Sequence, residues 1–222
     1  MKKEQSWISR HITLHDHADE KAERENMITH AIGIVLAIIF SFIVIFKKSA
    51  YVYTRTWVGM LIYAATLVLL YTSSTLYHHL PKSDLKRVFR LLDHANIYLL
   101  IAGTYSPILL FIGNEAAIRV LYIVWGVALL GILFSLIFWG KLKILHVLFY
   151  LAMGWMIVFF WKDIVPFIPT NLLFWIIAAG LTYTVGVIFY SKKHLPHSHM
   201  IWHLFCVVAS SLFCIGFLLH LH

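Results

Sequence analysis

The sequence predicts an all-α membrane protein, a bundle of about seven transmembrane helices. Of its 222 residues, 61% are hydrophobic and 13% are charged, and the mean hydropathy is +0.82. A soluble domain of this length does not carry that balance. Because a bilayer core about 30 Å thick takes roughly 20 apolar residues per helical crossing, about seven crossings fit after a polar start. We therefore divide the chain into a polar N-terminal segment, residues 1–26, and a transmembrane domain, residues 27–222.

The crossings are read from apolar runs that end at charged, glycine-containing or proline-containing breaks. In chain order, the predicted helices are residues 27–46, 57–78, 91–112, 118–138, 142–160, 172–190 and 199–219. The breaks between them are residues 47–48, 81–84, 113–115, 140–141, 166–169 and 192–196. All of these connections are short, so neighbouring helices are expected to run antiparallel.

The lysines and arginines predict a cytoplasmic N-terminus and a C-terminus outside. With that orientation, thirteen of the eighteen basic residues fall on the inner side and five on the outer side. Positive residues near helix ends are retained in the cytoplasm. The net charge of +8 is spread over the gaps between apolar runs, where a membrane protein needs it, and so predicts no nucleic-acid partner.

Four polar groups lie at the ends of the predicted helices. They are Glu23, Asn26, Thr29 and His30 entering the first helix; Ser74 and His78 leaving the second; Asp93 and His94 entering the third; and His199 and His203 entering the seventh. The predicted orientation puts all four groups on the cytoplasmic side. Ionisable groups in such places are costly and are the first candidates for function.

A metal site is the sharpest interpretation of these groups. His199 and His203 are spaced i and i+4, which puts them on one helical face, close enough to share a metal ion. A third ligand would complete the arrangement of catalytic zinc, with three protein ligands and one water, and His78 is the best-placed candidate. His79 is its rival. Imidazole suits zinc, although copper, nickel and iron accept the same ligands.

Plainer interpretations exist for each group. Among fourteen histidines, an i, i+4 pair also arises by chance. For Asp93 the plainer interpretation is an interfacial carboxylate paired with Arg87 or Arg90, and for Ser74 it is a hydroxyl bonded to its own helix backbone. Glu23 and Asn26 fit a helix cap and a first-turn acid that complements the helix dipole.

Taken together, Glu23-x2-Asn26-x2-Thr29-His30, Ser74-x3-His78, Asp93 and His199-x3-His203 resemble the motifs of the progestin and adipoQ receptor family. Within that family, the chain is similar to the bacterial hemolysin III-like branch, over nearly its whole length. The resemblance implies a seven-helix, multi-pass protein of the bacterial cell membrane. It also implies His78, His199 and His203 as Zn²⁺ ligands, with Ser74 and Asp93 near the metal-bound water and the Glu23–His30 motif near the site.

Such a site suits hydrolysis of an amide or ester. Zinc held by three neutral imidazoles lowers the pKa of a bound water to about 7, while Asp93 could take its proton and Ser74 could bond a developing oxyanion. Membrane lipids are the expected substrate, and the resemblance implies a ceramidase-like activity and a role in membrane fluidity. Two alternatives remain: a receptor-like membrane-homeostasis sensor with a structural zinc, and a pore-forming hemolysin.

Overall fold

The computed structural model describes residues 6–14, 19–141, 143–192 and 194–222. Within these ranges the chain is almost entirely helical, and seven of its helical segments are long and apolar enough to cross a membrane. The elements are α1 Trp7–His11, α2 Glu20–Phe46, η1 Lys48–Ala50, α3 Thr54–His79, α4 Asp84–Ile112, α5 Glu115–Ile137, α6 Lys143–Gly154, η2 Met156–Phe160, α7 Trp161–Ile164, η3 Val165–Phe167, α8 Thr170–Ser191 and α9 Ser198–His220. The predicted fold class is confirmed.

Two helices begin seven residues earlier than the apolar runs suggest. Helix α2 begins at Glu20 rather than at residue 27, because the side chain of Asp19 caps it by accepting from the backbone N–H of Lys21 at 3.2 Å. Helix α4 begins at Asp84 rather than at residue 91, with Ser83 as its cap. The Glu23–His30 motif and Asp93 therefore lie within helices and not at their entrances. Hydropathy locates the apolar part of a helix and misses its polar first turns.

The fifth crossing is broken. The sequence predicts one helix over residues 142–160, whereas α6 ends at Gly154 and the chain continues through η2, α7 and η3 to Phe167. The hydroxyl of Tyr105 stabilises the break: it donates to the carbonyls of Met153 and Gly154 and accepts from the backbone N–H of Ile157 at 3.1 Å. Irregular backbone at membrane depth needs such partners, because lipid provides none.

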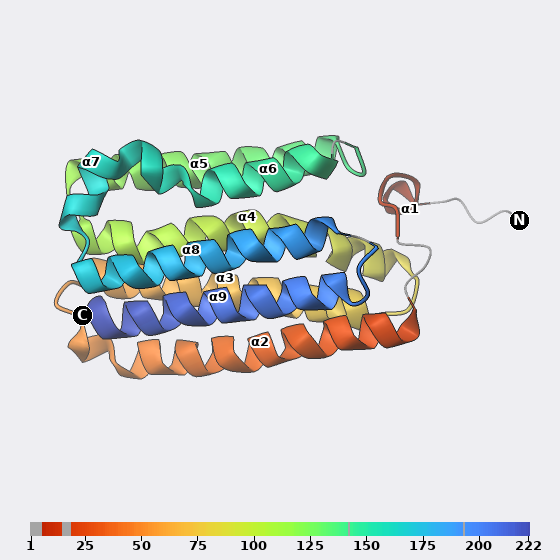
Figure 1. Cartoon of the computed structure of the whole chain (residues 1–222), viewed down its shortest axis with the longest axis horizontal. Coiled ribbons are helices and arrows are strands. Elements are labelled where there is room, and N and C mark those ends of the chain that lie inside the picture. The colour runs from red at the N-terminus through yellow and green to blue at the C-terminus, as the bar shows by residue number, and fades with distance from the viewer. Residues whose placement is uncertain (1–5, 15–18, 142, 193) are drawn as a thin grey trace, which may run out of the picture.

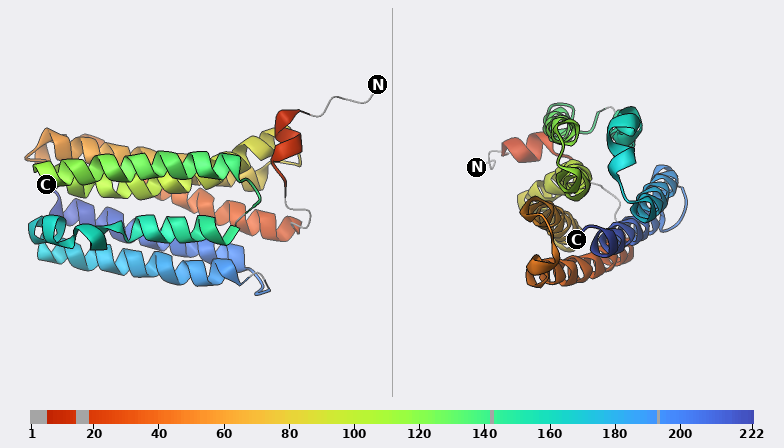
Figure 2. Two further views of the ribbon diagram at one scale, coloured as in Figure 1. Left: turned by 90° about the horizontal axis from the view of Figure 1, so that it is seen from above. Right: turned by 90° about the vertical axis from the view of Figure 1, so that its left-hand side faces the viewer.

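The long helices run nearly parallel to one axis (Figure 1). Helix α3 packs between α2 and α4, α5 packs on α4, and α9 joins α8 to α2. Helix α6 packs less closely on its neighbours, and the end-on view shows it at the periphery of the bundle (Figure 2).

Apolar side chains point outward as well as inward. On α2, an exposed stripe recurs at helical spacing, and its members are Ile28, Ile32, Val35, Ile39, Phe42 and Phe46. Soluble monomers rarely expose such a continuous apolar surface. The stripe is the surface that a lipid-embedded helix presents to acyl chains.

The described part of the N-terminal segment packs over the start of α4. Ser6 donates to a carboxylate oxygen of Asp84 at 2.6 Å, and Arg87 donates to the carbonyl of Ile12 at 3.0 Å. The side chain of Ile12 is buried. The described part of this polar segment thus lies against the start of α4, at the end of the bundle that carries the four polar groups.

A candidate metal centre at one end of the bundle

Three histidines from two helices form a cluster. His78 lies in the last turn of α3, and His199 and His203 lie one turn apart at the start of α9. Each offers one ring nitrogen, and these three nitrogens all lie within 4.8 Å of one another. The ring centroids are 4.5 to 5.3 Å apart. The cluster could therefore hold a metal ion, as the histidine spacing predicts.

The donor set fits a metal. Nε2 of His78 is buried and has no hydrogen-bond partner among the described residues. A buried polar atom without a partner costs about 1–3 kcal/mol, and a nitrogen lone pair can recover this by binding a cation. The rival ligand His79 is exposed on the next position of the same helix, so the cluster selects His78. Imidazole nitrogens suit zinc and other divalent transition metals.

A cavity of about 170 Å³ opens beside the cluster, between α4, α6, α8 and α9. Its wall at the histidine end includes His199, His203 and Asp93. Beyond them it is lined mainly by aliphatic and aromatic side chains, as far as Ile108 on α4. Asp93 and Ile108 are fifteen residues apart on one helix, which corresponds to about 22 Å along its axis.

Asp93 is largely buried at the polar end of this cavity. Its carboxylate lies 3.8 Å from Nδ1 of His94, which is hydrogen-bonded to the carbonyl of Arg90 at 2.9 Å. Arg87, one of the two partners that an interfacial pair would use, binds Asp84 instead, at 3.2 Å. Asp93 also lines the cavity, where its carboxylate can face a bound molecule.

Ser74 lies one turn before His78 on α3 and is completely buried. Its hydroxyl has no hydrogen-bond partner among the described residues, so it does not bond its own helix backbone. The structure does not place Ser74 in the wall of the cavity. A buried hydroxyl without a partner is available to a group that enters beside it.

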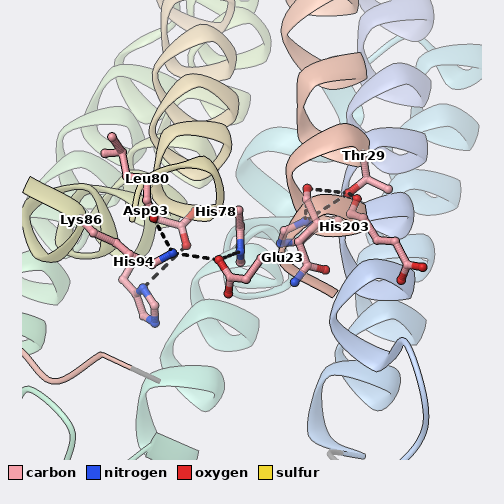
Figure 3. A network of polar contacts seen from close by, with 10 residues as sticks. Glu23, Thr29, His78, Leu80, Lys86, Asp93, His94 and His203 are labelled. Carbon is pink, nitrogen blue, oxygen red and sulfur yellow. Dashed lines mark hydrogen bonds and ion pairs between the residues drawn. The ribbon is translucent and has the colours of Figure 1, made fainter. Parts of the chain in front are cut away.

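Glu23 from α2 reaches the first ligand candidate. Its carboxylate oxygen Oε2 lies 3.3 Å from Nδ1 of His78 and accepts from Nζ of Lys86 at 2.9 Å. Figure 3 shows this line of contacts, with Glu23 between Lys86 and His78. Lys86 also donates to the carbonyl of Leu80 at 3.0 Å. Glu23 is thus more than a first-turn acid that complements the helix dipole.

The rest of the α2 motif surrounds His203. Nδ1 of His203 lies 3.2 Å from the carbonyl of Asn26. It also lies 3.3 Å from the hydroxyl of Thr29 (Figure 3). His30 stacks on the same ring, with centroids 3.5 Å apart and planes 15° from parallel. His30 is not part of the metal cluster among the described residues. The motif therefore packs against a candidate ligand instead of adding one.

Two contacts of the site are not indicated by the sequence. In the sequence, Lys86 is one of the basic residues that predict the orientation of the protein in the membrane. In the structure, its side chain is largely buried against Glu23. Glu25 binds Nδ1 of His197 at 2.6 Å and so fixes the start of α9 to α2. Each pair joins residues more than sixty positions apart, and no spacing within one helix indicates them.

Comparison with known proteins gives consistent matches. A family model described as "Haemolysin-III related" matches residues 19–214. Hemolysin-3 of Bacillus cereus is 36% identical over 200 residues, which cover 89% of this chain and 91% of that protein. The hemolysin-3 homolog of Bacillus subtilis (strain 168) is 36% identical over 203 residues, 89% of this chain and 94% of that protein. The human monocyte to macrophage differentiation factor is 30% identical over 194 residues, 84% of this chain and 79% of that protein.

Proposed function

This chain belongs to the haemolysin-III related family of multi-pass membrane proteins, and we propose that it is a zinc-dependent hydrolase of membrane lipids that cleaves an amide or ester. One observation carries the proposal: the three-histidine cluster stands at the head of a long apolar cavity whose wall includes Asp93. Metal ligands, a carboxylate and an apolar channel together suit a substrate with a polar head and an acyl chain.

The cavity supports a lipid as the substrate. Its lining residues on α4 run from Asp93 to Ile108, a helical rise of about 22 Å that is comparable to an extended acyl chain, and the lining there is mainly apolar. An amide or ester at the head of such a chain would lie beside His199, His203 and Asp93. A ceramide-like lipid amide has this form, and hydrolysis of such lipids would change the composition and fluidity of the membrane.

The residues divide the chemistry between them. His78, His199 and His203 would hold Zn²⁺, which when bound lowers the pKa of water and polarises a carbonyl. Asp93 would accept the proton of the attacking water and return it to the leaving nitrogen or oxygen. Ser74 lies outside the cavity wall, so its buried hydroxyl would donate to the developing oxyanion only once the lipid head has moved past that wall toward His78. The products are a fatty acid and the amine or alcohol of the lipid head.

The test compares turnover with metal content. Purified wild type and the Asp93→Asn and Ser74→Ala variants are reconstituted in vesicles that contain a fluorescent N-acyl lipid, and the released fatty acid is measured. We expect Asp93→Asn to reduce the rate by about 10²- to 10⁴-fold, with zinc content unchanged. A wild type that holds zinc but releases no fatty acid from lipid amides or esters would overturn the hydrolase.

A second function is favoured by one observation: the cluster joins the end of α3 to the start of α9. A metal ion there would cross-link two helices and stabilise the bundle without any reaction. The protein would then be a receptor-like sensor of membrane state. In that case Asp93→Asn and Ser74→Ala would leave the cellular response to membrane-fluidising agents intact, while loss of the histidines would remove it.

A further inference from the structure

Three residues in the first three turns of α2 meet the candidate ligands at their Nδ1 atoms, and His30 stacks on the ring of His203. Glu23 meets Nδ1 of His78, while Asn26 and Thr29 meet Nδ1 of His203. Each histidine has two ring nitrogens, and the hydrogen bond made by one decides which nitrogen is left to bind a metal. A helix that supplies no ligand of the cluster therefore touches two ligands at the atoms that decide their orientation.

The hydrogen bond between His78 and Glu23 can have only one direction. A carboxylate accepts hydrogen bonds and cannot donate them, so Nδ1 of His78 carries the hydrogen that it shares with Glu23. In the neutral ring, Nε2 then holds a lone pair. This is the nitrogen that is buried without a hydrogen-bond partner among the described residues. Glu23 thus selects the form of His78 that can bind a cation through Nε2.

Lys86 holds the carboxylate in place. Its ammonium group binds Oε2 of Glu23 and the carbonyl of Leu80, and it lies 5.1 Å from the centre of the Tyr77 ring. Leu80 is the residue that follows the last residue of α3 and caps its C-terminal end, two positions after His78. Lys86 therefore ties Glu23 to the same helix end that presents the ligand, and three helices, α2, α3 and α4, meet at this group of residues.

Given the proposed metal site, we propose that Glu23, supported by Lys86, is the positioning residue of His78: it fixes the Nδ1–H form of the ring and aims Nε2 at the metal. Asn26 and Thr29 do the same for His203 through a backbone carbonyl and a hydroxyl. The acidic motif of α2 is thus the outer support of the metal centre. It fixes the orientation of two of the three histidines before a metal binds.

The test is metal affinity, measured without turnover. Zn²⁺ is titrated against a chromogenic chelator in detergent-purified full-length protein, for wild type, Glu23→Ala, Glu23→Gln and Lys86→Met. We expect Glu23→Ala to weaken zinc binding by about 10- to 100-fold, the usual effect of removing such a support. Glu23→Gln should lose less, because its amide oxygen still accepts from Nδ1 of His78. The absorption bands of bound Co²⁺ should shift in Glu23→Ala.

Glu20→Ala is the matched control, since Glu20 is an exposed acid in the same first turn of α2. It removes the same charge and should bind zinc as wild type does. Wild-type affinity in Glu23→Ala would overturn the proposal, and so would an equal loss in Glu20→Ala, which would indicate a general charge effect. Metal-free unfolding temperatures identify a variant that has lost its fold. A wild type that binds zinc but hydrolyses no lipid would overturn the proposed hydrolase activity. The role of Glu23 would still be decided by the zinc affinities of the variants.

Discussion

The hydroxyl of Ser210 on α9 is shared by two tyrosines in the buried interior of the bundle. Tyr71 donates to it from α3 at 2.9 Å, and Tyr183 on α8 lies 2.7 Å from it. Ser210 is almost fully buried. Tyr71 also donates to the carbonyl of Cys206 at 3.2 Å, so removal of the serine hydroxyl would fall mainly on Tyr183. In an apolar interior an unsatisfied hydroxyl costs about 1–3 kcal/mol, so this serine is expected to contribute to stability.

We therefore predict that Ser210→Ala lowers the free energy of unfolding by about 1–3 kcal/mol. Its neighbour Ser211 supplies the control, because its hydroxyl donates to the carbonyl of Val207 in its own helix. Ser211→Ala should change stability by less than about 0.5 kcal/mol. Denaturant unfolding in detergent, followed by tryptophan fluorescence, measures both. Equal effects of the two substitutions would show that the shared hydroxyl has no special weight.

The sequence locates the histidine cluster, but it does not indicate the residues that hold the histidines in place. The i, i+4 spacing of His199 and His203 predicts that they share a face, because helix geometry alone decides it. The choice between His78 and His79 needs the rotation of α3, which only packing determines. The contact of Lys86 with Glu23 depends on three helices meeting, and no local pattern indicates it.

At the scale of elements, α3 and α4 approach each other at a glycine. A methyl group on Gly59 would lie 2.8 Å from the backbone of Ser106 and Pro107 on α4. Backbone atoms cannot rotate away, so α4 would have to shift. Small residues at helix contacts are a common way to bring membrane helices together.

Gly59→Ala is expected to destabilise the protein by about 1–3 kcal/mol, since added volume in a packed interior forces displacement of the backbone. Gly126 on α5 is the control, because a methyl group there meets nothing within 4 Å. Gly126→Ala should be neutral or stabilise by up to about 1 kcal/mol, through its higher helix propensity. Thermal unfolding of the two variants in one detergent compares them directly. A stable Gly59→Ala would contradict the close approach.

The elements themselves were largely predictable. Seven apolar runs gave seven crossings, because the length of a membrane helix and its hydropathy follow from bilayer thickness. The polar first turns of α2 and α4 were not predicted, because capping side chains and not apolar residues make them helical. The break after Gly154 was not predicted either, because the Tyr105 hydroxyl that supports it lies on another helix.

At the scale of the whole molecule, the described N-terminal residues and the C-terminus lie at opposite ends of the bundle (Figure 1). This arrangement is what seven crossings require. The basic residues, thirteen on one side and five on the other, predict that the end with the histidine cluster faces the cytoplasm. The site would then draw its metal and water from the cytoplasm.

Fusions at the C-terminus test this orientation. Alkaline phosphatase, which is active only outside the cytoplasm, should be active when it follows His222, and green fluorescent protein at the same position should be dark. The same two reporters placed after residue 81, in the turn before α4, should give the reverse pattern. A fluorescent C-terminal fusion would place the histidine cluster outside and contradict the charge count.

His78, His199 and His203 are proposed to bind one metal ion. The most direct measurement is elemental analysis of purified wild type and a His199→Ala, His203→Ala double variant, with His220→Ala, His222→Ala as a control that removes two histidines at the opposite end of α9. We predict about one zinc per chain in wild type and in the control, and none in the His199, His203 variant. Wild type without metal, or metal that survives the loss of His199 and His203, would contradict the metal site.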